Sequence, residues 1–102
     1  MIIVIATIEL AEGQRDAFLQ AFHGLVPAVR AETGCREYGP TVDVETDIAA
    51  QQTLRDNVVT VVEKWDDLPA LQAHLIAPHM QEYRKTVKDL VVGTSLQILQ
   101  PA

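Results

Sequence analysis

Residues 2–10 carry the sequence IIVIATIEL, an almost continuous apolar run that is rich in β-branched side chains. Such a run favours a central strand that is covered on both faces. Alternate residues starting at Ile2 would point to one face of the sheet, and those starting at Ile3 would point to the other. A second run of the same kind, VVTVVEKW at residues 58–65, predicts another strongly apolar strand.

An amphipathic helix is expected after the first strand. From about Gln14 to Thr33 apolar residues recur at three- and four-residue spacing, which places them on one helix face. Gly34 stands where a glycine cap would end the helix. Pro27 lacks a backbone N–H and clashes one turn back, so it predicts a kink or two helical pieces.

Weaker patterns predict the rest of the chain. Residues 35–46 alternate weakly and contain Pro40, which suits an edge strand. Residues 46–57 are polar and predict a long hairpin connection, and residues 91–99 predict a final strand.

A second helical region follows residues 58–65. Asp66 or Asp67 would cap it, and Pro69 is tolerated in its first turn. Pro78 would divide it into two pieces. The resulting order is β-α-β-β-α-β, the ferredoxin-like split β-α-β plan of the α+β class.

We expect one domain over residues 1–102, with a four-stranded antiparallel sheet covered by helices on one face. The other face is also rich in apolar residues, and exposed apolar sheet surface marks an interaction site. The sequence therefore predicts a homodimer that forms through this sheet face.

The composition argues against several kinds of partner. The formal net charge is −6, and no run of Lys and Arg occurs, so neither nucleic acid nor an anionic membrane is expected as a partner. Cys35 is the single cysteine, which precludes an intramolecular disulfide and fits a cytoplasmic protein. The apolar start has no basic flank and is too short to span a bilayer.

Four segments resemble one known family. They are ETGC (Glu32–Cys35), EYGPTVDV (Glu37–Val44), VTVVEKW (Val59–Trp65) and LQAHLIAPHMQEYR (Leu71–Arg84). Together they are similar to the antibiotic biosynthesis monooxygenase family, which includes small quinol monooxygenases. The resemblance implies a dimeric α+β barrel that oxygenates a quinol-like or polyketide-like aromatic with O₂ and without metal or flavin. Such chemistry needs an apolar cavity, a proton acceptor and hydrogen bonds to an anion.

His74 and Trp65 are the predicted catalytic residues. His74 lies on the flank of an apolar helix stripe and titrates near neutral pH, so it is the candidate base. The alternative is a partly buried histidine that bridges backbone groups. The resemblance implies that Trp65 lines the pocket, where an indole could stack on a flat aromatic. The alternative is a core tryptophan.

Glu63, Tyr38 and Tyr83 are the predicted substrate-binding residues. Glu63 shares a strand face with apolar neighbours, so it needs a partner or a raised pKa. It would orient His74 or hold a substrate hydroxyl, unless it pairs with Arg30, Arg36 or Arg84. The two tyrosines could donate to an anionic oxygen, and simple packing is their alternative role.

No cofactor or metal is predicted. His79 follows His74 by five residues rather than the four of a helical metal pair, and no glycine-rich phosphate loop occurs. Haem-degrading relatives carry an asparagine on the first strand, where this chain has Ala6-Thr7-Ile8, which puts haem degradation in doubt. Arg84, Lys85 and Lys88 are predicted to form a solvated helix face.

Two other functions fit the same sequence. One is a non-catalytic module that binds a small apolar metabolite. The other is a proton-transfer isomerase of a small carbonyl compound, which would need a more polar pocket and an inward cation such as Arg36.

Overall fold

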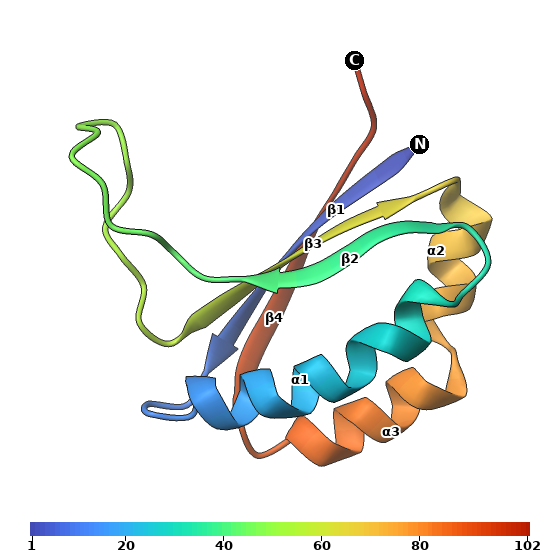
Figure 1. The fold of residues 1–102 in the computed structure, drawn as a ribbon, viewed down its shortest axis with the longest axis horizontal. Helices are drawn as coiled ribbons and strands as arrows, with labels where there is room; N and C mark the ends of the chain where they lie inside the picture. Colours follow the sequence, from blue (N-terminus) through green and yellow to red (C-terminus); the bar gives the residue numbers. More distant parts are fainter.

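The computed structural model describes residues 1–102 as a four-stranded antiparallel sheet with three helices on one face (Figure 1). The sheet order is β2-β3-β1-β4. In chain order the elements are β1 (Ile2–Leu10), α1 (Arg15–Arg30), β2 (Cys35–Thr41), β3 (Val58–Trp65), α2 (Leu68–Leu75), α3 (Pro78–Val87) and β4 (Val91–Leu99). The predicted α+β class and ferredoxin-like order are therefore confirmed.

The two apolar runs form the centre of the sheet, as predicted. β1 pairs with β3 in a register that sets Val4 opposite Glu63 and Ala6 opposite Val61. These side chains face the helices and are buried, whereas Ile3 on the opposite face is only half-buried. The register thus brings one carboxylate, that of Glu63, into the apolar layer between sheet and helices.

Helix α1 is a single helix that continues through Pro27, so the alternative of two helical pieces is wrong. Pro27 lies in the last turn, where a missing N–H removes one hydrogen bond next to the end of the helix. The face that includes Phe18, Phe22 and Val29 is fully buried against the sheet. That burial outweighs the local cost of the proline.

Gly34 ends the region after α1 with a backbone φ of +83°, which side chains rarely tolerate. A methyl group at this position would lie 2.7 Å from Ala70 Cβ on α2. The Gly34 carbonyl also accepts a hydrogen bond from the Asp66 N–H at 2.9 Å. The turn that follows α1 therefore packs directly against the turn that begins α2.

Helix α2 begins at the predicted cap. The Asp67 side chain accepts a hydrogen bond from the Ala70 N–H at 2.9 Å, and Pro69 lies in the first turn. The chain breaks at Ala77 and restarts as α3 at Pro78. This break turns the chain, so that α2 lies at one end of the helical layer and α3 runs beside α1 (Figure 1).

The segment 42–57 projects away from the helical layer (Figure 1). Strand β2 ends at Thr41, so the edge strand is shorter than predicted and this connection is longer. Arg55 holds the two sides of the connection together through hydrogen bonds to both carboxylate oxygens of Asp43. Val44 and Ile48 are exposed along it.

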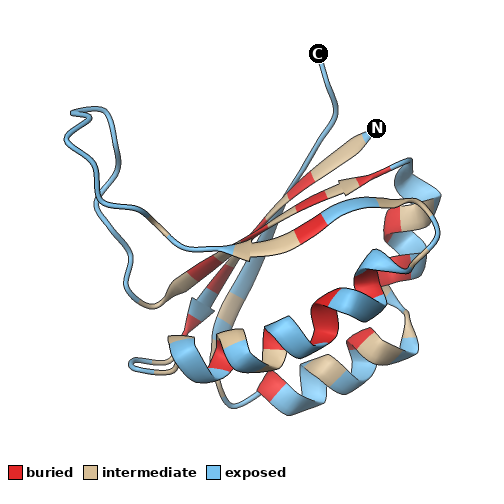
Figure 2. Cartoon of the chain, in the orientation of Figure 1, coloured by how far each residue is buried: buried red, intermediate tan, exposed pale blue.

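Strand β4 is the least covered part of the sheet (Figure 2). Leu96 and Ile98 lie opposite Ala6 and Val4, on the face that carries the helices. They nevertheless remain 43% and 46% exposed, because the helices cover the other strands. No helix of the chain combines the length and apolarity needed to cross a membrane.

Candidate active site

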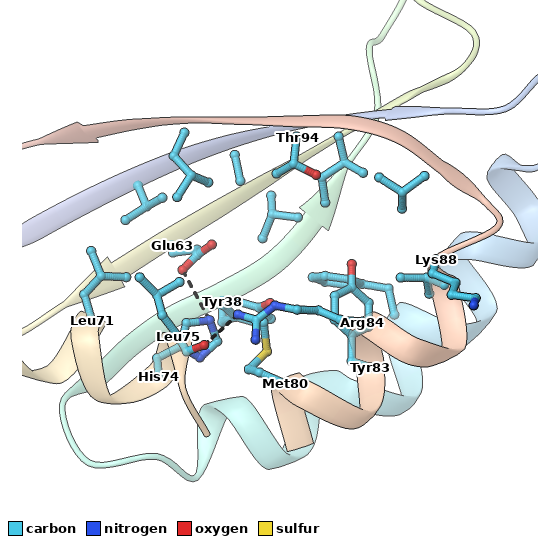
Figure 3. A pocket seen from close by; sticks show the side chains of 18 residues that line it. Tyr38, Glu63, Leu71, His74, Leu75, Met80, Tyr83, Arg84, Lys88 and Thr94 are labelled. Atoms are coloured by element: carbon cyan, nitrogen blue, oxygen red, sulfur yellow. Dashed lines mark hydrogen bonds and ion pairs between the residues drawn. The ribbon is translucent and has the colours of Figure 1, made fainter. Parts of the chain in front are cut away.

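A cavity of about 420 Å³ lies between the sheet and the helices (Figure 3). Thirteen of its eighteen lining residues are hydrophobic, and they come from all four strands and all three helices. The other five are Glu63, His74, Arg84, Lys88 and Thr94, and the hydrophobic set includes Tyr38 and Tyr83, whose hydroxyls add two further polar groups. The space is therefore an apolar chamber with a small set of polar groups, as is common for small-molecule sites.

His74 is buried on α2 and lines this cavity. Its Nδ1 lies 2.9 Å from Glu32 Oε2, and its Nε2 lies 4.0 Å from Glu63 Oε1. A neutral imidazole that donates from Nδ1 to Glu32 keeps an acceptor lone pair on Nε2. The geometry thus favours the tautomer that presents a base toward Glu63.

Burial sets the protonation of both partners. It lowers the pKa of His74, although the hydrogen bond to Glu32 opposes this shift. Burial also raises the pKa of Glu63 to about 7, against the hydrogen bond from Trp65. Near neutral pH the site therefore holds a neutral imidazole beside a carboxyl group that keeps its proton in part of the population.

Glu32, in the turn after α1, is the site residue that was not singled out from the sequence. Its Oε2 contacts both His74 Nδ1 and, at 2.7 Å, His79 Nε2. The predicted role of orienting His74 is thus taken by Glu32, and Glu63 faces the other ring nitrogen. The available sequence signal was ETGC, in which Glu32 precedes the glycine that packs against α2.

Trp65 contacts Glu63 and His74 from outside the cavity. It is completely buried and is not among the residues that line the cavity, so the prediction of a pocket wall does not match its position. Its Nε1–H donates to Glu63 Oε1 at 3.0 Å, and its ring centroid lies 4.7 Å from that of His74. Because Trp65 ends β3, its side chain is enclosed where the sheet meets α2.

Glu63 forms no ion pair with the arginines considered from the sequence. Arg30 donates to the Tyr38 carbonyl, Arg36 pairs with Asp66, and Arg84 donates to the Leu75 carbonyl. Arg36 therefore does not supply the inward cation that an isomerase of a sugar-like compound would need. The charged form of Glu63 has only the Trp65 N–H and nearby His74 for support.

Tyr38 and Tyr83 both line the cavity. Burial raises the pKa of each phenol above its ordinary value, so both stay protonated and act as donors rather than bases. Tyr38 stacks on Phe22 and meets the His74 ring edge-on, with centroids 5.4 Å apart in both pairs. These contacts restrict the position of the Tyr38 ring beside His74.

Glu32, His74 and His79 are the one cluster that resembles a metal site, with candidate ligand atoms within 4.8 Å of one another. Ligand atoms around a tetrahedral zinc lie about 3.3 Å apart, given zinc–nitrogen bonds of about 2.0 Å. Here both histidine nitrogens approach one oxygen at 2.9 and 2.7 Å, which are hydrogen-bond distances. The arrangement fits a hydrogen-bonded triad better than a metal centre.

The predicted solvated basic face is confirmed, because Arg84, Lys85 and Lys88 are all exposed, but two of these residues also border the cavity. Arg84 and Lys88 line the cavity, although their side chains also reach solvent. Lys85, between them in sequence, is exposed and lies 3.9 Å from Glu82. Helix α3 and its C-cap residue therefore place two cations at the border of the cavity.

The fold and site together define a ferredoxin-like α+β domain with an acid–base pair at an apolar cavity. The chain belongs to the antibiotic biosynthesis monooxygenase family, whose model matches residues 1–86. It is 40% identical to the "Probable quinol monooxygenase YgiN" of Escherichia coli K12, over 99% of this chain and 98% of that protein. These relationships support a monooxygenase-type function.

Solved structures agree on the fold. PA3566 from Pseudomonas aeruginosa is 25% identical, with a TM-score of 0.81 over 99% of this chain and 93% of that chain. SO0527 from Shewanella oneidensis is 28% identical, with a TM-score of 0.77 over 96% and 87% of the two chains. A Methanosarcina mazei protein has a TM-score of 0.83 at 20% identity, over 99% and 92%, and this likeness concerns the fold alone.

Proposed function

We propose that this chain is a monooxygenase that oxidises a quinol-like or polyketide-like aromatic with O₂ and without a metal or flavin cofactor. Family membership and the similarity to a probable quinol monooxygenase support the proposal. The observation that carries it is the position of His74 Nε2, 4.0 Å from Glu63 Oε1, at the edge of an apolar cavity.

In this proposal His74 is the general base. The Glu32 carboxylate holds the ring through Nδ1, so Nε2 can accept a proton from a phenolic hydroxyl in the cavity. Glu32 then stabilises the imidazolium, as the orienting carboxylate does in a catalytic triad. Deprotonation makes the aromatic ring electron-rich enough to reduce O₂.

The oxygenation step needs no external reductant. The quinolate passes one electron to O₂, and the resulting superoxide and semiquinone form a C–O bond at a ring carbon that carries hydrogen. The hydroperoxide O–O bond then breaks, that carbon loses its proton and becomes a carbonyl, and the departing hydroxide takes a proton to become water. The sum is quinol plus O₂ giving hydroxyquinone plus water, with four electrons passing from the substrate to O₂.

Glu63, Tyr38 and Tyr83 bind the substrate oxygens. Protonated Glu63 donates a hydrogen bond and supplies the proton that the departing hydroxide needs. The tyrosine hydroxyls donate to the phenolate. Trp65 is a positioning residue here, because its N–H holds Glu63 Oε1 and leaves Oε2 for the substrate.

Oxygen uptake with a panel of hydroquinones and anthrones tests this mechanism. His74→Gln should lower kcat by about 10²- to 10⁴-fold, which is the usual contribution of a general base. His23→Gln is the matched control, because His23 is exposed on α1 and does not line the cavity. Equal rates in the two variants would remove His74 from the mechanism.

Labelled dioxygen distinguishes oxygenation from simple oxidation. With ¹⁸O₂, one labelled atom should enter the organic product and the other should appear in water. Mass spectrometry of freshly formed product measures this directly. A product without label, with all reduced oxygen in water or peroxide, would contradict a monooxygenase.

We also propose a homodimer formed through the sheet face opposite the helices. Ile3, Ile5 and Val62 are half-buried on this face, and pairing with a second copy would cover them. Ile5→Glu should give a monomer in sedimentation experiments, whereas Ile76→Glu, an exposed change after α2, should not. A monomeric wild-type protein at micromolar concentration would refute the proposal.

The acid–base pair also supports a second candidate, a proton-transfer isomerase. Glu63 with a raised pKa and His74 with a lowered pKa could exchange a proton with a carbonyl compound. This reaction does not consume O₂. Turnover that persists under strict anaerobiosis would favour the isomerase over the oxygenase.

A further inference from the structure

The cavity carries more cationic than anionic side chains, although the chain as a whole has a net charge of −6. Glu63 is its only carboxyl group, and burial keeps that group partly protonated near neutral pH. Arg84 and Lys88 provide two cations. An acidic protein thus concentrates positive charge on the surface of one apolar cavity.

These two cations have unused hydrogen-bonding capacity. Neither forms an ion pair with a carboxylate of the chain, and the side-chain ammonium of Lys88 makes no hydrogen bond. Arg84 uses one of its five N–H groups, which donates from Nη2 to the Leu75 carbonyl at 2.6 Å. The other donors of its planar guanidinium remain available to a ligand.

The cations are arranged in line with the acid–base pair. Arg84 lies on α3, and Lys88, four positions later, is the C-cap residue with a helical backbone conformation, so the two lie on the same side of the helix end. Figure 3 shows Glu63 and His74 together at one end of the cavity, Lys88 at the other, and Arg84 between them. A flat molecule lying along the cavity would present one end to the base and the other to the cations.

We propose that Arg84 and Lys88 bind an anionic substituent of the substrate, so that the preferred substrate is a quinol that carries a carboxylate. The term quinol rests on the proposed function, whereas the carboxylate rests on the two cations. The planar guanidinium matches a carboxylate in a two-pronged hydrogen bond. Holding the carboxylate at α3 would direct the ring hydroxyl toward His74.

Ligand binding tests the carboxylate without requiring turnover. The probes are 6-hydroxy-2-naphthoate and 2-naphthol, two fluorescent molecules that differ in the carboxylate group. The wild-type protein should bind the carboxylate probe about tenfold more tightly than 2-naphthol, as expected for a partly solvated charge-assisted contact. Arg84→Met should remove most of this preference, and Lys88→Met should reduce it.

Lys85→Met is the matched control, because it removes one positive charge from the exposed face of the same helix. It should leave the preference unchanged. If Arg84→Met disturbs the α2–α3 turn by losing the Leu75 contact, binding of 2-naphthol falls as well, and Lys88→Met then decides the result. Equal affinities of the two probes in the wild type, or an unchanged preference in both cavity variants, would overturn the inference.

The binding result is separate from the oxygenase proposal. A carboxylate preference that depends on Arg84, in a protein that oxygenates no hydroquinone, would leave this inference standing and reject the proposed function. Oxygenation with no carboxylate preference would do the reverse.

Discussion

The two ends of the cavity differ in how firmly their side chains are held. At the end formed by β3 and α2, Glu63, Trp65 and His74 are all buried and bonded to one another or to Glu32. At the edge of the cavity formed by β4, Leu96 lines the cavity but remains 43% exposed. The groups suited to proton transfer thus occupy the closed end, where packing fixes their orientation.

The edge of the cavity along β4, which we call the open end, is suited to ligand entry. A ligand needs a route into the space between sheet and helices, and an edge strand without a helix over it provides one. The contrast predicts that changes at the closed end alter stability and chemistry together, whereas changes at the open end alter binding and leave the fold intact. Four measurements test this difference between the closed end and the open end.

The largest expected effect is on stability. Trp65→Ala would leave a cavity in a completely buried site and an unsupported Glu63, so we expect a loss of about 3–5 kcal/mol in the free energy of unfolding. Leu96→Ala at the open end should cost less than about 1 kcal/mol, because the side chain is already 43% exposed. Urea denaturation measures both, and similar losses would abolish the distinction.

The pH dependence of stability should come next. Glu63 keeps its proton to about pH 7 in the fold but has an ordinary pKa of 4.5, so between these values the unfolded chain binds fewer protons at this site. The contribution of Glu63 to stability therefore falls as pH rises from about 4.5 to 7, by an amount on the order of 3 kcal/mol.

His74 acts in the opposite sense, because its lowered pKa makes stability rise as pH increases toward its ordinary value of 6.5. The difference between wild type and Glu63→Gln isolates the carboxyl group. We expect Glu63→Gln to gain stability relative to wild type across this window. A difference that does not change with pH would show that the Glu63 pKa is not raised.

A smaller effect is expected for the residue that positions the base. Glu32→Gln keeps an acceptor for His74 but loses the charge that stabilises the imidazolium, so kcat should fall about tenfold. The acidic limb of the pH–rate profile should also move to lower pH, which a purely structural role would not cause. Glu12→Gln, an exposed change after β1, should alter neither.

The smallest effect concerns Cys35 at the edge of the closed end. Burial and the nearby charges of Glu32 and Glu63 raise the pKa of its thiol. We expect it to react with iodoacetamide a few-fold more slowly than glutathione does at pH 8. A thiol that reacts faster than glutathione would mean that this edge opens in solution.

The secondary structure was largely predictable because it follows local rules. The apolar runs, the glycine after α1 and the Asp67 cap each express a preference of a few neighbouring residues. The single helix through Pro27 was not predictable, because burial of the α1 face outweighs a local penalty. Cytoplasmic location and dimerisation stay predictions.

The site was less predictable, since it depends on contacts between distant segments. His74 and Glu32 are 42 residues apart, and no periodicity relates them. The helix and strand patterns singled out His74 and Glu63, the resemblance to the family implied a role for Trp65, and the structure brings these three together. It could not indicate that Trp65 lies behind Glu63, or that the exposed Arg84 also lines the cavity.

The absence of a side chain at Gly34 lets the turn after α1 pack closely against α2. This close packing affects the position of His74, the proposed base. His74 stands one helical turn beyond Ala70, the residue that a methyl group at position 34 would strike. Any larger side chain at position 34 would push α2 away from the turn. The His74 imidazole would then move away from the Glu32 carboxylate. A reaction that depends on this histidine would then be lost through a residue that never meets the substrate.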